Sequence, residues 1–535
     1  MSNVTHVPPS AWGGGGGDDG GGTLRPRDAV PDGFVAAPYY PTPRGGWLAD
    51  WNASYAKAQA MVSSMTLAER TNITAGSGYL MGPCVGNTGS ATRLGFPQLC
   101  LMDSALGIAS TDNNTAFPAG ITAGATWDKS LMYQRGVAIG EEFRCKGANV
   151  FLGPVVGPMG RKPLAGRIWE GFGADPVLQG FGAYLTIQAV QQQGVIATIK
   201  HLIGNEQERY RMNDAVQSGY SANIDDRTMH ELYLWPFAQA VRAGVGAVMA
   251  AYNAVNGSAC SQNSYLLNGL LKDELGFQGF ALGQIQDIYT EGLYIDYRYL
   301  NKNNMTARFA FGHGLSYTQF TYTNATITAV TPLTALPPTR PAKGSTPVYS
   351  SAIPPAAEAV APSGFHTIWR YLYSWLSASD AAAASTSSHY AYPAGYSTTQ
   401  TAGPPAGGGP GGNPALFDVA YTVALTVTNT GTRYAGKAVA QAYVQFPVAG
   451  NPYDTPTVQL RDLEKTATLA PGQSATVTLS LSRKDLSVWD VQAQNWVVPA
   501  PAGRFKIWVR EASDRLYLAC YTDALRCEGG LASPV

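Results

Sequence analysis

The sequence predicts an α/β fold of the TIM-type (β/α) barrel kind in the N-terminal half and an all-β sandwich in the C-terminal part. Between residues 94 and 283, short apolar segments alternate with longer segments of helical periodicity. That order is typical of parallel α/β folds, and the number of repeats suits a barrel. From residue 320 onward, apolar and polar residues alternate in short segments separated by Gly, Pro and Asn turns, which indicates strands of a sandwich.

The first segments precede the alternating pattern. Residues 1–46 are rich in Gly, Pro and Asp, with Gly13 to Gly17 unbroken, and this composition predicts a disordered arm. Trp51 to Met65 is predicted to be a helix. Thr66 follows, with Glu69 three residues later, which is the spacing of a capping box at the start of a second helix.

The alternating part gives the predicted barrel elements. Strands are expected at Leu94–Asp103, Ala148–Pro158, Val195–Ile199, Val245–Asn253 and Phe277–Gly283. Helices are expected at residues 177–193, at Asp225–Gly244 with Asp225 or Asp226 as the cap, and at Ser264–Gly276 with Gly276 as the terminator.

The stretch from Gly194 to Arg211 organises this part of the chain. Its apolar run reads as a strand buried on both faces, and it ends at Lys200 and His201. Polar side chains at the carboxyl end of a parallel strand are where barrel enzymes place their sites. The alternative is that both residues are merely the polar edge where a strand reaches the surface. The polar GNEQE loop that follows favours a pocket.

The C-terminal part contains five segments with a period of two, separated by an unusual insertion. The segments are Phe320–Val330, Val419–Gly431, Ala438–Phe446, Gln459–Leu481 and Gly503–Ser513. The insertion, at about 332–414, is rich in Pro, Ala, Ser, Thr and Gly, and within it His366–Ser377 is expected to form one helix.

Composition limits the classes of partner. The 535 residues carry no net charge and only 13% are charged, which argues against nucleic acid or an anionic membrane. No run of 18 apolar residues exists, so no membrane span is expected. The scattered His and Cys residues have no ligand spacing, so no metal and no cofactor are expected.

Sequons and cysteines point to an oxidising compartment. Asn-x-Ser/Thr sites occur at Asn3, Asn52, Asn72, Asn113, Asn256, Asn304 and Asn324. Cys84 with Cys100, and Cys520 with Cys527, each flank a loop and are expected to form disulfides. Cys145 and Cys260 have no evident partner, and no secretion signal is visible at the N-terminus.

Several long motifs together resemble glycoside hydrolase family 3, in particular fungal secreted β-glucosidases. The motifs, in chain order, are LCLMDSALGI, NVFLGPVVGPMGRKPLAGRIWEGFGADP, GVIATIKHLIGNEQERYR and NIDDRTMHELYLWPFAQAVRAGVGAVMAAYN, followed later by RFAFGHGLSYTQF. The resemblance covers residues 47–283 and resumes at about 287. It implies a barrel followed by a fibronectin type III-like domain, secretion, and hydrolysis of terminal β-D-glucosyl residues from oligosaccharides or glucosides. A homodimer is a further expectation.

The resemblance also implies a set of sugar-binding residues. Asp103, Arg167, Lys200 and His201 match the family positions that hold hydroxyls of the first glucose, and Met249 and Tyr252 match residues that line the site. A carboxylate and cationic donors suit vicinal hydroxyls, because they form charge-assisted hydrogen bonds. The alternative for Asp103 and Arg167 is a simple ion pair between loops.

The resemblance breaks at the catalytic carboxylates. A retaining glycosidase needs two carboxyl groups about 5 Å apart. The family places its nucleophile in GFxGFVMSDW, but this chain reads GFQGFALGQIQ, so Gln284 stands at that position. Asp287 is a weak substitute candidate, because a shift along a strand changes the face on which a side chain lies. The segment that holds the family's acid/base glutamate is absent.

These comparisons predict four regions. They are the arm at 1–46, a truncated barrel at 47–286, a connector at 287–320 and a fibronectin type III-like domain at 321–535 that contains the insertion. The barrel should be incomplete, with open sheet edges. Ala250 stands where the family has a cysteine that pairs with the position of Cys260, so that disulfide is lost.

Three functions remain open at this point. The first is a β-glucosidase relative whose chemical step is crippled, and the second is a non-catalytic carbohydrate-binding protein. The third treats Lys200 as a Schiff-base lysine of a lyase, which the adjoining family motifs disfavour.

Overall fold

The computed structural model describes residues 40–76, 84–211, 219–282, 293–348 and 402–535. Several sequence-based predictions lie outside these ranges. They are Gln284, Asp287, the Asn3 sequon, the helix at His366–Ser377 and nearly all of the N-terminal arm.

Both helices that the sequence predicts at the start of the described chain are present, but the first begins and ends two residues earlier than predicted. Helix α1 spans Ala49–Ser63 and α2 spans Leu67–Ala75. Thr66 and Glu69 form a reciprocal capping box, in which the threonine hydroxyl accepts the Glu69 N–H at 3.2 Å and the carboxylate accepts the Thr66 N–H at 2.9 Å. The capping box therefore fixes the residue at which α2 begins.

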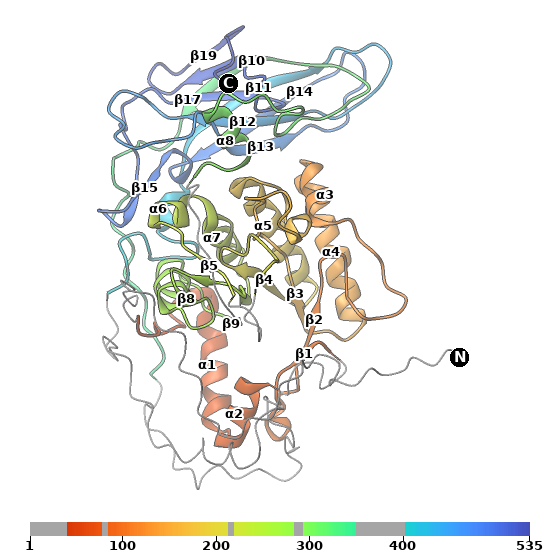
Figure 1. Ribbon diagram of the computed structural model, residues 1–535, viewed down its shortest axis with the longest axis vertical. Helices are drawn as coiled ribbons and strands as arrows, with labels where there is room; N and C mark the ends of the chain where they lie inside the picture. Colours follow the sequence, from red (N-terminus) through yellow and green to blue (C-terminus); the bar gives the residue numbers. More distant parts are fainter. Residues whose placement is uncertain (1–39, 77–83, 212–218, 283–292, 349–401) are drawn as a thin grey trace, which may run out of the picture. The chain divides into compact units, whose positions relative to one another are not determined.

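A six-stranded sheet lies at the centre of the α/β part, in the order β1-β2-β3-β4-β6-β9 (Figure 1). The strands are β1 Gly86–Asn87, β2 Cys100–Asp103, β3 Val150–Leu152, β4 Ile196–Leu202, β6 Ala247–Ala250 and β9 Phe280–Leu282. All neighbours are parallel except β1 and β2. Within the described residues the sheet does not close, so the predicted incomplete barrel is confirmed as a half-barrel.

Helices connect the strands. They are α3 Gly120–Ala125, α4 Lys129–Cys145, α5 Pro176–Gln192, α6 Asp226–Thr228, α7 Trp235–Arg242 and α8 Asp296–Lys302, with π-helical segments at Met229–Tyr233 and Tyr265–Glu274. Short 3-10 turns lie at Thr92–Leu94, Arg167–Glu170, Pro414–Phe417 and Lys484–Leu486, and a small sheet comprises β5 Ser221–Ala222, β7 Ala254–Val255 and β8 Ser258–Ala259.

The predicted continuous helix at Asp225–Gly244 is wrong in one respect. It is divided into α6, a π-helical segment and α7, and the Leu234 N–H bonds to the Met229 carbonyl, five residues back. Pro236 has no N–H to donate and its ring would clash with the carbonyl four residues earlier, so a regular helix cannot pass through it. Asp225 caps the start, accepting the Thr228 N–H at 2.9 Å.

The two faces of the sheet have different surroundings. Residues such as Met102, Phe151 and Val248 belong to the large core that includes the helices. The alternate residues Leu101 and Leu152 belong instead to a separate small apolar cluster. In a closed barrel, strands from the opposite side would cover this second face. Here that face borders the cavity described below.

The C-terminal part is a sandwich of two antiparallel sheets. One contains β10 Phe320–Ala329, β11 Val419–Asn429 and β14 Ser474–Ser482, and the other contains β13 Gln459–Lys465, β12 Val439–Gln445, β17 Lys506–Arg510, β18 Leu518–Tyr521 and β19 Arg526–Gly529. Alternate side chains from both sheets fill one core. The sequence reading missed β18, β19 and the hairpin formed by β15 Val488–Asp490 and β16 Asn495–Val497.

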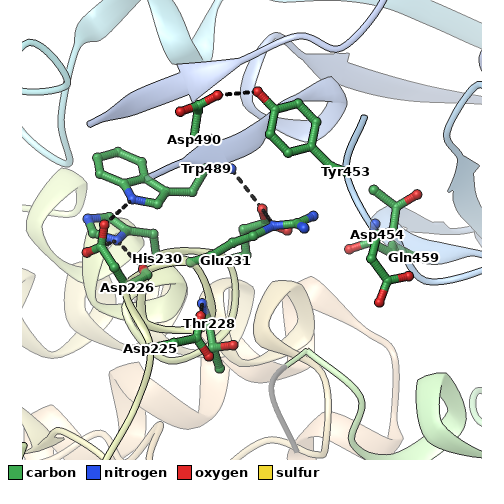
Figure 2. Close-up of polar contacts among 12 residues, drawn as sticks. Asp225, Asp226, Thr228, His230, Glu231, Tyr453, Asp454, Gln459, Trp489 and Asp490 are labelled. Carbon is green, nitrogen blue, oxygen red and sulfur yellow. Dashed lines mark hydrogen bonds and ion pairs between the residues drawn. The ribbon is translucent and has the colours of Figure 1, made fainter. Parts of the chain in front are cut away.

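The β15 hairpin contacts the α6 region of the half-barrel, as Figure 2 shows. The Trp489 indole stacks on the His230 ring with centroids 3.5 Å apart, and its Nε1–H donates to Asp226 at 2.8 Å. The Trp489 backbone N–H donates to Glu231 at 2.7 Å. His230 also contacts Glu274 at 3.1 Å. The contacts of Trp489 with Asp226, His230 and Glu231 join the sandwich to the α/β part.

Candidate functional site

A cavity of about 1130 Å³ lies on the open face of the half-barrel sheet. Its lining includes all six sequence-predicted sugar-binding residues, namely Asp103, Arg167, Lys200, His201, Met249 and Tyr252. They come from the ends of β2, β4 and β6 and from the loops after β3 and β6, which is the carboxyl edge of the parallel strands. Apolar residues of the second face, including Leu101 and Phe280, line the rest.

Asp103 and Lys200 form the charged pair of the cavity. Lys200 is 3% exposed, and its Nζ lies 3.9 Å from the Asp103 carboxylate, whose side chain is 49% exposed. Burial lowers the pKa of Lys200, while the charges of Glu170 and Asp103 oppose that shift. The exposed carboxylate therefore remains available to accept hydrogen bonds from a ligand.

Arg167 pairs with Glu170 rather than with Asp103. The two residues are three positions apart, and a 3-10 turn brings their side chains together. The guanidinium donates Nε–H and Nη2–H to the two carboxylate oxygens, the latter at 3.0 Å. Burial opposes the charge of Arg167, but the hydrogen bond and charge of Glu170 outweigh it and raise the pKa of the guanidinium. The alternative of a simple Asp103–Arg167 ion pair is not what the structure contains.

His201 is a neutral group at the base of the cavity. It is 2% exposed, and its Nδ1 lies 3.4 Å from the Gly157 carbonyl and 3.3 Å from the Asn205 amide. Burial, followed by the charges of Lys200 and Arg167, holds its pKa well below 6.5. With Nδ1 engaged in this way, the Nε2 of a neutral imidazole serves as either a donor or an acceptor, and a hydroxyl group can match either role.

Met249 and Tyr252 close one side. Met249 stands beside Lys200 in the β4–β6 register, and the Arg211 guanidinium lies 4.7 Å from the centroid of the Tyr252 ring. Arg211 and Glu170 also line the cavity, and the sequence reading did not assign them to it. Both stand in motifs already quoted, but nothing in their spacing showed that they would face the same space.

Glu206 and Glu208, which follow the strand, have structural roles. Glu206 is buried and accepts the backbone N–H groups of Met159, Gly160 and Arg161 at 2.6, 3.0 and 2.9 Å. Burial raises its pKa, and these three donors oppose the shift. Glu208 pairs with Arg211 at 2.8 Å. Glu206 fixes the loop that follows β3 and thereby shapes the cavity.

The carboxylates along the described part of the cavity lining are therefore Asp103 and Glu170. Asp103 forms an ion pair with Lys200, and Glu170 accepts hydrogen bonds from Arg167 on both of its oxygens. Gln284 and its weak substitute Asp287 lie outside the described residues. The residue ranges that the structure covers contain no group of three His, Cys, Asp or Glu side chains that could hold a metal.

Both expected cysteine pairs are disulfide-bonded. Cys84–Cys100 lies next to the cavity, with Cα atoms 5.6 Å apart, and Cys520–Cys527 joins β18 to β19. Cys260 is buried and free, and Cys145 is exposed and free. No helix in the described ranges is long and apolar enough to cross a membrane.

The expected glycosylation sites differ in accessibility. The side chains at Asn52, Asn113, Asn256, Asn304 and Asn324 are exposed, and Asn72 is half-buried. Asn256 also hydrogen-bonds the Ile224 backbone through both amide atoms, at 2.9 and 3.2 Å. Its amide nitrogen is therefore less available than those of the other exposed sites.

Two family descriptions match the chain. "Glycosyl hydrolase family 3 N terminal domain" matches residues 85–299, and "Fibronectin type III-like domain" matches residues 438–513. The first contains the half-barrel sheet and every predicted sugar-binding residue, and the second lies within the sandwich.

Similar proteins include fungal β-glucosidases. "Probable beta-glucosidase F" of Aspergillus fumigatus is 36% identical over 827 residues, covering 91% of this chain and 95% of that protein. "Beta-glucosidase 2" of Saccharomycopsis fibuligera is 52% identical over 260 residues, which cover 46% of this chain and 30% of that protein. The solved structure of a Chaetomium thermophilum β-glucosidase superposes with a TM-score of 0.80 at 27% identity, covering 91% of this chain and all of that one.

The first of these alignments is longer than the chain itself. It spans 827 positions, whereas the whole chain has 535 residues. The relative therefore contains, within the aligned span, many residues that this chain does not have.

Proposed function

This chain belongs to glycoside hydrolase family 3, and we propose that its cavity binds a terminal β-D-glucosyl residue of cellobiose, cello-oligosaccharides or β-glucosides, with the hydrolytic step largely lost. The observation that supports binding is the convergence of Asp103, Arg167, Lys200, His201, Met249 and Tyr252 on one cavity. The observation that supports loss of hydrolysis is Gln284 at the nucleophile position.

The binding chemistry follows from the charges of these groups. The Asp103 carboxylate accepts hydrogen bonds from two neighbouring hydroxyls, while Lys200 donates to an adjacent one. The Arg167–Glu170 fork presents a fixed donor edge, and neutral His201 adds one donor or one acceptor at Nε2, because its Nδ1 already contacts Gly157 and Asn205. The Tyr252 ring supplies an apolar surface for the C–H face of the sugar.

The chemical step needs more than these residues supply. A retaining mechanism requires one carboxylate to attack the anomeric carbon and a second carboxyl group to protonate the leaving oxygen. An amide at position 284 is a poor nucleophile. Glu170 is not placed for the proton-transfer role, because Arg167 donates hydrogen bonds to both of its oxygens.

Two measurements on the purified chain test the two halves of this proposal. Calorimetry should detect saturable binding of glucose and cellobiose, while an aryl β-glucoside assay shows turnover far below that of a relative purified alongside. Absence of sugar binding would refute the first half, and turnover at the relative's rate would refute the second.

A variant pair tests the assigned binding group. Asp103→Asn removes a charge-assisted interaction worth about 1.5–3 kcal/mol, so glucose affinity should fall about 10- to 150-fold. Asp112→Asn, at an exposed position, is the matched control and should bind like the wild type. Equal affinities of the two variants would remove Asp103 from the site.

A mechanism-based label separates the second candidate, a wholly non-catalytic carbohydrate-binding protein, from a weakly active enzyme. A fluorinated glucosyl fluoride traps the covalent intermediate on a carboxylate nucleophile, which intact-mass measurement detects. No mass increase is expected, and this result supports the non-catalytic function. Labelling at Asp287 would show that it replaces the family nucleophile.

We also infer that the protein is secreted and glycosylated. Two disulfides and exposed sequons at Asn52, Asn113, Asn304 and Asn324 support this, since both features belong to oxidising compartments. Recovery from the medium of a fungal host, with a mass loss on endoglycosidase treatment, is the expected result. Sedimentation of the same sample tests the expected homodimer.

A further inference from the structure

A second cavity, of about 320 Å³, lies where the sandwich meets the helices of the half-barrel. Its lining comes from α4, α5 and α7 on one side and from β11, β13, β14 and the Pro414–Phe417 and Lys484–Leu486 turns on the other. It shares no lining residue with the cavity on the half-barrel sheet. None of the sugar-binding residues that the family resemblance implies lines this second cavity.

A buried arginine in this cavity is incompletely satisfied. Arg461 is 3% exposed, its Nε–H donates to the Asp485 carbonyl at 2.9 Å and its Nη2–H donates to Gln459 at 3.0 Å. Its Nη1 is buried and has no hydrogen-bond partner in the ranges that the structure describes. A buried guanidinium nitrogen without a partner is costly, and it requires an acceptor.

A buried lysine lies in the same cavity. Lys484 is 3% exposed, and its Nζ lies 4.4 Å from the Trp235 ring centroid and 4.9 Å from that of Trp496. Among the described residues it forms no ion pair. Aromatic faces stabilise an ammonium group, but they do not neutralise its charge.

The carboxylates that line the cavity already have partners. Asp462 accepts the Ser480 N–H at 2.7 Å and lies 3.5 Å from Lys129, and Glu464 lies 3.0 Å from the same lysine. Asp485 accepts both the N–H and the hydroxyl of Ser482, at 2.7 and 2.6 Å. The lining carries three carboxylates against four cationic side chains, those of Lys129, Arg242, Arg461 and Lys484, and so has an excess of one positive group.

We propose that this cavity binds a small oxyanion, such as sulfate, phosphate or a carboxylate group, between Arg461 and Lys484. An oxyanion supplies the acceptor that Arg461 Nη1 needs and the counter-charge that Lys484 needs. Arg242, which stacks on Phe417 at 3.8 Å, adds a third cation at the same cavity. A bound anion would join the sandwich to the helices through one shared ion.

The charges around Lys484 predict how binding depends on pH. Burial lowers the pKa of Lys484 to about 7, with Glu274 and Asp485 raising it and Arg242 and Arg461 lowering it further. An anion in contact with the ammonium raises that pKa, so binding takes up a proton. Affinity should therefore fall about tenfold between pH 6 and pH 8.

Calorimetric titration of the full chain with inorganic sulfate tests the proposal, because the charge of sulfate is constant over this range. We expect saturable one-to-one binding that weakens about tenfold from pH 6 to pH 8, with proton uptake seen as a dependence of the heat on the buffer. Displacement by acetate would identify a carboxylate as the natural occupant. Displacement by phosphate alone would identify an inorganic anion.

Variants locate the site. Lys484→Met keeps the length and apolar stem of the side chain and should weaken sulfate binding at least about tenfold while abolishing proton uptake. Arg461→Gln should also weaken binding. Lys302→Met, which removes an exposed lysine elsewhere, is the control and should bind normally. Absent or pH-independent binding by the wild type, or an unchanged Lys484→Met variant, would overturn the proposal.

Discussion

The buried ion pair between Asp175 and Arg298 makes a quantitative prediction about how the connector attaches to the half-barrel. The Arg298 Nη2–H donates to Asp175 Oδ2 at 3.2 Å, and the side chains are 1% and 0% exposed. The other oxygen, Oδ1, caps α5 by accepting the Val177 N–H at 2.8 Å and the Leu178 N–H at 3.3 Å. Asp175→Asn can keep the cap while removing the charge.

The expected cost is large because Arg298 would stay buried without a counter-charge. Its remaining partner would be the Tyr297 hydroxyl at 3.5 Å. Removing one member of a buried pair costs about 3–5 kcal/mol of the free energy of unfolding. With a urea slope of about 3 kcal/mol per molar, the midpoint of the transition that includes α5 should fall by about 1 M or more.

Urea unfolding followed by tryptophan fluorescence measures this shift. Asp454→Asn is the control, because its pair with Lys302 is exposed on both sides and should contribute about 1 kcal/mol or less. Adding Arg298→Met to Asp175→Asn should recover part of the loss, since the unpaired charge is then gone. A shift no larger than that of the control, or a double variant that loses the sum of both, would refute the reasoning.

Three further predictions concern other groups. His230 has a raised pKa, because burial opposes its charge but Glu274 and Asp226 outweigh it. Its contribution to stability is thus present below pH 6.5 and lost as the pH rises through the folded value, and His230→Gln should flatten that dependence in thermal melts. Glu206→Ala leaves three backbone N–H groups, one buried and two half-buried, without their acceptor, so it should cost about 2 kcal/mol or more in denaturant unfolding and weaken glucose binding. A stable variant with normal binding would exclude a positioning role. Opening Cys84–Cys100, which closes a separation of 16 residues, should cost about 3 kcal/mol, and an unchanged midpoint in the double-serine variant would contradict the loop-entropy estimate.

The sequence predicted the half-barrel because its signals are local. Apart from β1, which was not predicted, each strand of the central sheet contains a short apolar run. In β2 and β4 this run ends at a charged residue, Asp103 or Lys200, so strand position and site residue are visible together. The break at Pro236 was also visible, but the strong helical periodicity around it concealed the change of register. β18 was missed because Leu518–Tyr521 is a short apolar segment without a distinctive alternation.

Contacts between distant parts of the chain could not be predicted in this way. The Arg167–Glu170 fork depends on a 3-10 turn whose geometry the loop sequence does not specify. The second cavity brings Arg242 of α7 together with Arg461 and Lys484, which lie more than 200 residues later in the sequence. No spacing rule relates such residues, because only the packing of helices on strands makes them neighbours.

Strand β9 is the edge of the sheet within the described residues, and this edge is a suitable place to insert a segment from another protein. Strand β9 ends at Leu282, and the described chain resumes at Leu293, next to the α8 segment that Asp175 holds through Arg298. A chimaera that receives the corresponding segment of a longer relative between these two points would join two anchored ends. The rate at which such a chimaera hydrolyses an aryl β-glucoside would measure how well the remaining half-barrel can still support catalysis.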